Sequence, residues 1–193
     1  MLHVYASGRH GSDYVNKDAV YPDTEATDEL CQGIAERFQD DIVEVVVAPA
    51  VGGVILSQGV ARHLTRMTGQ KVLSIYADKV EGSNGLVIKR GYEKFVPSKR
   101  VLVVDDVLTT GGSVKRLVDL VRILGGVVVG VGVLCNRGNV QPSDIGTPKL
   151  EALISVQMAT YDEAGCLLCA QGVPINTEVG EGMKFLARKA KVW

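Results

Sequence analysis

Short runs of Val, Ile and Leu alternate along this chain with segments of helical periodicity, and this alternation limits the fold more than any other feature. Continuous aliphatic runs are typical of strands buried on both faces, and intervening helices supply the crossovers of a parallel sheet. We therefore predict a Rossmann-like α/β fold with a parallel sheet. The expected strands are Ile42–Ala48, Val72–Ala77, Val101–Val104, Val127–Leu134 and Leu150–Val156, and the expected helices are Thr27–Phe38, Val54–Met67, Ser113–Leu124 and Met183–Ala190.

The composition fits one aliphatic domain. The chain has 193 residues, of which 46% are hydrophobic but only 5% aromatic, and this length suffices for a full core. A net charge of −1 supplies no field that would recruit nucleic acid or an anionic membrane. We find no stretch that resembles a signal peptide or reaches transmembrane length, so we expect a cytoplasmic protein.

The segment from Val101 to Ser113 reads VLVVDDVLTTGGS and joins an expected strand to the start of an expected helix. A helix N-terminus offers unpaired N–H groups and the positive end of the peptide dipoles, which together suit a phosphate. Glycines allow the backbone to approach the anion, and hydroxyls add donors. The residues expected to bind phosphate are Thr109, Thr110, Gly111, Gly112 and Ser113.

Two adjacent carboxylates, Asp105 and Asp106, precede this phosphate loop. They would repel a phosphate, so we expect them to accept hydrogen bonds from sugar hydroxyls or to hold a hydrated cation. Phosphate on one side and a polyol on the other describe a ribose 5-phosphate site. An ordinary strand–turn–helix with an acidic edge is the plainer alternative.

The whole segment resembles the signature of the type I phosphoribosyltransferases, whose donor is phosphoribosyl pyrophosphate (PRPP). The resemblance implies that Val104 and the residues after it bind PRPP, and that Asp105 and Asp106 are catalytic. It also implies a single domain over residues 1–193, with a core at about 27–137. A small hood from residues 1–26 and 138–182 would hold the base.

A second glycine turn, Ala50-Val51-Gly52-Gly53, follows the expected strand at Ile42–Ala48. It matches the family's pyrophosphate loop, and Lys79 matches a catalytic lysine that contacts pyrophosphate. The resemblance further implies Mg²⁺ that bridges pyrophosphate and ribose oxygens. Since Mg²⁺ keeps waters and substrate oxygens as ligands, Asp105 and Asp106 are expected to contact it mainly indirectly.

The acceptor base is indicated by three further places in the sequence. The segments Ser7–His10 and Tyr14–Asp18 resemble the N-terminal substrate segment of orotate phosphoribosyltransferases, and Arg137 matches an arginine near the base in that family. We expect Arg9, Tyr14 and Arg137 to bind the base, with Arg137 able to grip a carboxylate. Thr109 stands where the 6-oxopurine enzymes carry an Asp that acts as a base toward the purine ring, which disfavours hypoxanthine and guanine as acceptors. Orotate is therefore the expected acceptor.

The segment Ala77–Tyr92 departs from the orotate family's mobile loop, since it has no histidine and resembles a β-hairpin through Leu86–Lys89. Two alternatives therefore stay open beside orotate transfer. One is transfer to another base such as adenine. The other is a non-catalytic sensor of PRPP or a nucleotide. The resemblance also implies a homodimer.

Cys166 and Cys169 form a C-x-x-C turn, which is half of a zinc-binding pattern. The remaining cysteines and histidines are scattered in sequence, so partner ligands cannot be named. An inert turn, a mixed-ligand or intersubunit zinc site, and redox chemistry remain alternatives.

Overall fold

The computed structural model describes residues 1–5 and 7–190, and its contacts divide the chain into two compact units. The terminal unit combines Met1–Asn16 with the described residues from Gln157 onward, and the sheet unit spans Lys17–Val156. These bounds differ from the expected hood and core. Residues 17–26 and 138–156 belong with the sheet, because they contain the start of its first helix and its last strand.

The sheet unit holds a six-stranded sheet in the order β5-β4-β3-β6-β7-β8. All neighbouring pairs are parallel except β4 and β5, which are antiparallel. This arrangement confirms the predicted α/β fold class. The strands are β3 (Val45–Pro49), β4 (Leu73–Lys79), β5 (Leu86–Val87), β6 (Arg100–Leu108), β7 (Val127–Asn136) and β8 (Leu150–Ser155).

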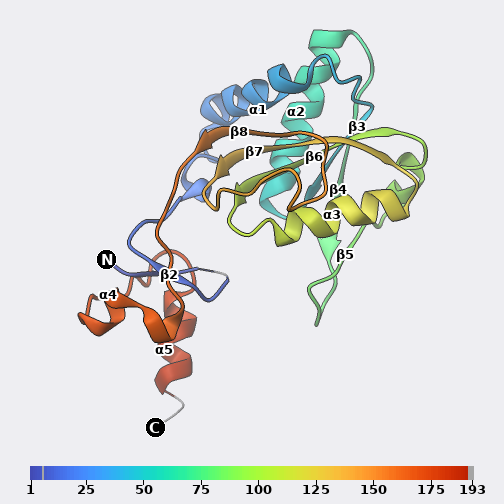
Figure 1. Cartoon of the computed structure of the whole chain (residues 1–193). Helices are drawn as coiled ribbons and strands as arrows, with labels where there is room; N and C mark the ends of the chain where they lie inside the picture. The colour runs from blue at the N-terminus through green and yellow to red at the C-terminus, as the bar shows by residue number, and fades with distance from the viewer. Residues whose placement is uncertain (6, 191–193) are drawn as a thin grey trace. The chain divides into compact units, whose positions relative to one another are not determined.

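Three long helices cover the two faces of this sheet: α1 (Thr24–Phe38), α2 (Gly52–Thr68) and α3 (Gly112–Ile123). Alternate residues of β3 show how the faces are divided. Val46 and Ala48 pack in the cluster formed by α1 and α2, whereas Val45 and Val47 pack in the cluster that contains α3. Figure 1 shows α1 and α2 on one side of the sheet and α3 on the other. The buried, aliphatic character of both faces explains why the strands read as continuous apolar runs.

Strand β6 continues four residues beyond its predicted end, from Val104 to Leu108. Its parallel pairing with β7 persists as far as Leu108 and Asn136, so Asp105 and Asp106 lie within the strand rather than after it. Carboxylates in a strand interior break the apolar pattern, so the apolar run in the sequence ends at Val104 although the strand continues. The helix that follows begins at Gly112, one residue before the predicted start.

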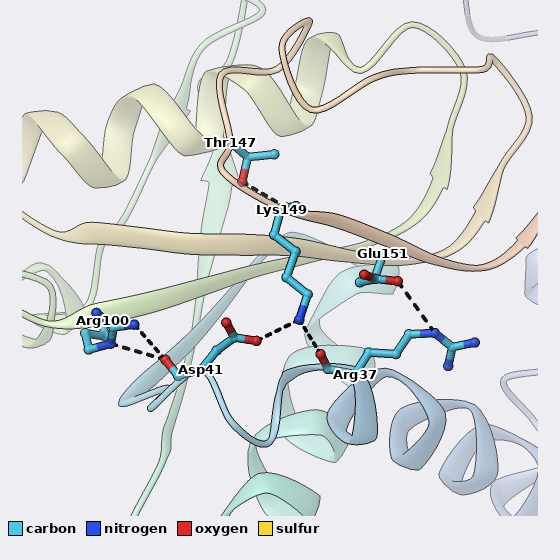
Figure 2. A network of polar contacts seen from close by, with 6 residues as sticks. All are labelled: Arg37, Asp41, Arg100, Thr147, Lys149 and Glu151. Atoms are coloured by element: carbon cyan, nitrogen blue, oxygen red, sulfur yellow. Dashed lines mark hydrogen bonds and ion pairs between the residues drawn. The ribbon is translucent and has the colours of Figure 1, made fainter.

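A polar network closes the opposite, amino-terminal edge of the sheet (Figure 2). Lys149 Nζ donates to Asp41 Oδ2 at 2.8 Å and to the Arg37 carbonyl at 2.6 Å. Arg100 donates from Nη2 to the Asp41 carbonyl at 2.9 Å. The network joins the end of α1 to the beginnings of β6 and β8, so the edge that carries the acidic pair is left for another role.

The terminal unit is built from short elements: β1 (His3–Val4), β2 (His10–Gly11), α4 (Leu167–Ala170) and α5 (Gly182–Ala190). β1 and β2 form an antiparallel pair, and bridges join Leu2 to Ile175 and His10 to Tyr161. Leu2, Val4, Cys166 and Phe185 form its buried hydrophobic cluster, and Tyr5 is also buried. This unit also contains a 3-10 turn at Glu163–Gly165, whereas the 3-10 turns at Lys17–Ala19 and Tyr92–Phe95 belong to the sheet unit. Across residues 1–5 and 7–190, each helix falls short of the length and apolar character that a membrane crossing requires.

Candidate active site

Two helix N-termini meet the carboxyl edge of the sheet at neighbouring strands. Helix α2 begins at Gly52 just after β3, and α3 begins at Gly112 after β6. In the described part of the chain neither helix has a side-chain cap, whereas α1 is capped by Asp23, whose carboxylate accepts from two backbone N–H groups at 3.1 Å. The first N–H groups of α2 and α3 are therefore available to an anion.

The loop before α3 is shaped by glycines and by contacts with the segment after β7. Gly111 has φ +72°, and a Cβ at this position would lie 2.5 Å from a methyl carbon of Ile145. Gly138 is tighter still, because a Cβ there would lie 1.6 Å from the Thr109 carbonyl oxygen. Nearby, Arg137 Nε donates to Thr109 Oγ1 at 2.8 Å. The phosphate loop and the loop after β7 are therefore packed against each other.

Asp105 is partly exposed and Asp106 is buried, and the negative charges of the two carboxylates are neutralised to different extents. Asp106 is buried, and its Oδ2 lies 2.7 Å from Lys17 Nζ, while its Oδ1 accepts from the Val107 N–H at 2.7 Å. Asp105 Oδ1 accepts from the Asp106 N–H at 2.9 Å. Burial, followed by repulsion from Asp106, raises the pKa of Asp105 to about 7. The pair therefore carries more negative charge than its surroundings neutralise, and a cation would relieve the excess.

Two residues of this site, Lys17 and Tyr21, were not predicted from the sequence. Lys17 lies within the Tyr14–Asp18 segment, but its pairing with Asp106 depends on a long-range contact that no local sequence pattern indicates. The Tyr21 hydroxyl is buried and has no hydrogen-bond partner among the described residues. Burial and the nearby carboxylates raise the pKa of Tyr21.

Gly52 allows the start of α2 to lie close to the acidic pair. A Cβ on Gly52 would be 2.9 Å from Asp106 Oδ2 and 3.3 Å from Lys17 Nζ. The N-terminal end of α2 therefore lies directly beside the buried carboxylate. The preceding peptide bond, between Ala50 and Val51, is cis, and the Val51 side chain is 84% exposed. The pyrophosphate loop expected from the sequence thus borders Asp106 and solvent.

Lys79 ends β4, on the side of β3 away from β6, and its charge lowers the pKa of Asp105 against the larger effects that raise it. It pairs with Leu86 of β5, and Asp78 pairs with Val87, so the expected hairpin is confirmed at Leu86–Val87. The turn between the strands covers residues 80–85. Lys79 thus belongs to the base of a hairpin, not to the middle of a long loop.

Arg9 and Tyr14 lie in the terminal unit, where both make contacts within that unit. Arg9 donates to the Thr160 hydroxyl and carbonyl, each at 2.9 Å, and forms an ion pair with Asp162 at 3.2 Å. Tyr14 stacks on His3 with ring centroids 5.3 Å apart. These contacts tie the N-terminal segment to residues 160–162.

A family model described as the phosphoribosyl transferase domain matches residues 22–153, which include the acidic pair and both glycine turns. The chain belongs to this family. Among curated relatives, an orotate phosphoribosyltransferase of Desulforamulus reducens is 40% identical over 168 residues, which cover 87% of this chain and 82% of the relative. Both the family and the type of relative agree with the resemblance found in the sequence.

Solved phosphoribosyltransferases share the fold. The Mycobacterium tuberculosis orotate phosphoribosyltransferase, solved with inorganic phosphate, aligns with a TM-score of 0.63 at 22% identity, covering 81% of this chain and 86% of that one. The same enzyme has been solved in complex with PRPP, and that structure aligns with a TM-score of 0.57 over 74% of this chain and 81% of that one, also at 22% identity. An adenine phosphoribosyltransferase of Thermoanaerobacter pseudethanolicus aligns with a TM-score of 0.60 at 21% identity, covering 75% and 89% of the two chains. The phosphoribosyltransferase fold is thus shared by enzymes named for different bases.

Within this phosphoribosyltransferase, the sheet unit by itself brings together most of the residues selected from the sequence. The carboxyl edge of the sheet gathers the acidic pair, both glycine turns and the Arg137–Thr109 contact. Arg9 and Tyr14 belong to the terminal unit and are described there alone.

Proposed function

We propose that this chain transfers the phosphoribosyl group of PRPP to orotate, giving orotidine 5′-monophosphate and pyrophosphate. The observation that carries the donor site is the pair of uncapped helix N-termini beside one acidic pair. PRPP has a phosphate at one end and a pyrophosphate at the other, with ribose hydroxyls between them. Two anion sites separated by carboxylates match this order of groups.

In this proposal the loop before α3 holds the 5-phosphate and the loop before α2 holds the pyrophosphate. Thr110 and Ser113 are exposed, so their hydroxyls can turn toward the phosphate with the first N–H groups of α3. The turn Ala50-Val51-Gly52-Gly53 leads into α2, and the N–H groups at the start of the helix would face the pyrophosphate. The Ala50 N–H itself donates to the Ala77 carbonyl at 2.8 Å. Lys79 adds a positive charge near the leaving group.

The carboxylates of Asp105 and Asp106 are proposed to accept hydrogen bonds from the ribose hydroxyls. The uncompensated charge at Asp105 also fits Mg²⁺, a hard cation that prefers oxygen ligands. Asp105 and Asp106 would hold it, in part through water, together with substrate oxygens. When bound, Mg²⁺ supplies neutralisation of the pyrophosphate charge.

The chemistry asks the protein mainly to position two substrates and to stabilise charge. The bond between the anomeric carbon and the pyrophosphate oxygen breaks, and the oxygen takes the electron pair. A ring nitrogen of the base donates its pair to that carbon and gives its proton to solvent. The N–H groups of α2 are aimed at the oxygens where negative charge accumulates, which lowers the barrier without a covalent intermediate.

Orotate is proposed as the acceptor for two chemical reasons. Thr109 cannot remove a proton from a base at neutral pH, and orotate reaches the site already anionic. Arg137 comes from the loop packed on the phosphate loop, and its guanidinium suits the orotate carboxylate. Names of curated relatives at 36–40% identity support the same acceptor. Arg9 and Tyr14 stay predicted base contacts, and a cytoplasmic homodimer stays the expected form.

The test is pyrophosphate release from PRPP and Mg²⁺ with orotate, uracil, adenine, hypoxanthine or xanthine offered separately. We expect release with orotate, and expect Arg137→Lys to raise the KM for orotate more than the KM for PRPP. Release with adenine alone would overturn the acceptor while keeping the donor site. If no base gives pyrophosphate release although PRPP binds measurably, the proposed transferase activity is wrong and the chain is a PRPP sensor.

A further inference from the structure

The terminal unit has few buried side chains to hold its two chain ends together. Its strands have two residues each and α4 has four. Its apolar cluster has four buried members, Leu2, Val4, Cys166 and Phe185, and Tyr5 is buried as well. Small lobes with little core are often fastened by a disulfide or a structural metal. The four cysteines of this chain are free thiols, so a disulfide does not fill this role.

Three potential metal ligands converge inside this unit. His10 Nδ1 lies 3.2 Å from the Cys169 sulfur, and the ligand atoms of His10, Cys166 and Cys169 all lie within 4.8 Å of one another. In tetrahedral zinc sites the metal lies about 2.3 Å from sulfur and about 2.0 Å from nitrogen, so ligand atoms are separated by about 3.5 Å. The three side chains are already near these positions, and only small rotations would be needed.

The histidine is the informative member, because a buried imidazole normally finds partners at both nitrogens. His10 is 0% exposed, its Nδ1 faces a thiol, and its Nε2 has no hydrogen-bond partner among the described residues. A thiol is a weak acceptor and a weak donor, so this arrangement satisfies the ring poorly.

The cysteines are arranged as they are in a metal-binding turn. Cys166 precedes the short helix α4, and its sulfur accepts a hydrogen bond from the Cys169 N–H at 3.4 Å. Cys166 is buried and Cys169 is partly exposed, so the site has a route for an ion to enter.

We propose that His10, Cys166 and Cys169 bind one Zn²⁺, which fastens the N-terminal strand pair to the C-terminal part of the terminal unit. Two thiol protons leave as the metal enters, so Zn²⁺, two thiolates and a neutral imidazole form a site of zero net charge. A neutral site avoids the cost of burying an unpaired charge. The fourth position is open to a water molecule. This assignment is independent of the acceptor base.

The test uses the full chain, stripped with a chelator under reducing conditions and titrated with Zn²⁺ against a chromophoric competitor. We expect one Zn²⁺ per chain and a rise in thermal stability on binding. Co²⁺ in place of zinc should show thiolate-to-metal charge transfer and the intense d–d bands of a tetrahedral ion. Uptake should be lost in Cys169→Ser and His10→Asn and kept in Cys135→Ser and His3→Asn.

Cys166→Ser is not the decisive variant, because Cys166 also belongs to the core of the unit. Cys169→Ser and His10→Asn must first show the far-UV spectrum of the zinc-free parent chain. No uptake by the parent, uptake unchanged in both variants, or an octahedral Co²⁺ spectrum would overturn the zinc site. So would a Cys166–Cys169 disulfide in the purified protein, found by counting two rather than four thiols.

Discussion

Lys17 Nζ lies 2.7 Å from Asp106 Oδ2, so a residue far from the signature in sequence neutralises one of its two carboxylates. Lys17 is the first residue of the sheet unit, and its ammonium also lies 3.5 Å from Asp18. The pairing leaves Asp105 as the carboxylate with the larger excess of charge. The two acids of the signature therefore have different electrostatic surroundings.

Replacing Lys17 with Met should weaken the donor site. The variant leaves Asp106 buried without its partner, and two adjacent anions then repel the phosphates of PRPP. We expect kcat/KM for PRPP to fall about tenfold or more, which corresponds to at least about 1.4 kcal/mol of transition-state stabilisation. The free energy of unfolding should fall by about 1 kcal/mol, since the Lys17–Asp106 ion pair is partly exposed.

Lys17→Arg is the matched control, because it keeps the charge. Lys17→Arg should retain most of the parent's PRPP affinity, as measured by calorimetry. Because the guanidinium has a different geometry from the ammonium, kcat should still fall, but by less than in Lys17→Met. Lys17→Met with unchanged kcat/KM would show that the ion pair has no part in donor binding.

Asp105 makes stability depend on pH in a defined direction. Its pKa is raised from the ordinary 3.8 to about 7 in the folded chain, so between these values the folded state holds a proton that the unfolded state has released. The contribution of Asp105 to stability is therefore largest below pH 4, is lost as the pH rises through about 7, and changes little above that.

Asp105→Asn removes this titration. We expect the variant to be more stable than the parent at pH 8 and to show a shallower decline of its melting temperature between pH 5 and pH 8. Transfer activity should nevertheless be lost, because the amide cannot replace the anion. If the melting temperatures of parent and variant change with pH in parallel across this range, the raised pKa of Asp105 is wrong.

The sheet was predictable because its central strands β3, β6 and β7 are buried and largely apolar on both faces. Val45 and Val47 face α3 while Val46 and Ala48 face α2, so burial on both sides leaves an aliphatic run that can be recognised locally. The ends of the strands were harder to predict. Asp105 and Asp106 interrupt the run, yet pairing with β7 carries β6 on to Leu108. The strand continues because backbone hydrogen bonds, which the side-chain pattern does not encode, remain satisfied.

The site was predictable where it is contiguous and not where it is assembled from distant segments. The loop from Thr109 to Ser113 carries its own glycines and hydroxyls, so its place before α3 could be predicted. The contact of Lys17 with Asp106 spans most of the sheet unit, and the pairing of His10 with Cys169 joins the two chain ends. Such contacts depend on tertiary packing, for which a single sequence offers no periodic signal.

Gly138 should be among the least replaceable residues of the phosphate site. Gly138→Ala would place a Cβ 1.6 Å from the Thr109 carbonyl oxygen, so either loop must move. We expect a loss of about 2–4 kcal/mol in unfolding free energy and a marked loss of PRPP affinity. Gly165→Ala is the control, since a Cβ there meets nothing within 4 Å and should change stability by no more than about 0.5 kcal/mol.

Val51 offers a way to separate helix stability from anion binding at the start of α2. Its side chain is 84% exposed and precedes Gly52, so Val51→Asp would place a carboxylate at the positive end of the helix. This charge should stabilise α2 by about 0.3–1 kcal/mol while it competes with pyrophosphate for the same N–H groups. We expect a higher melting temperature without ligand and a PRPP dissociation constant about tenfold weaker or more. Val51→Asn adds a side chain of similar size without charge, so it should weaken PRPP binding much less. Equal effects of Asp and Asn would place the pyrophosphate away from α2, and both quantities can be measured on one preparation by calorimetry and thermal melting.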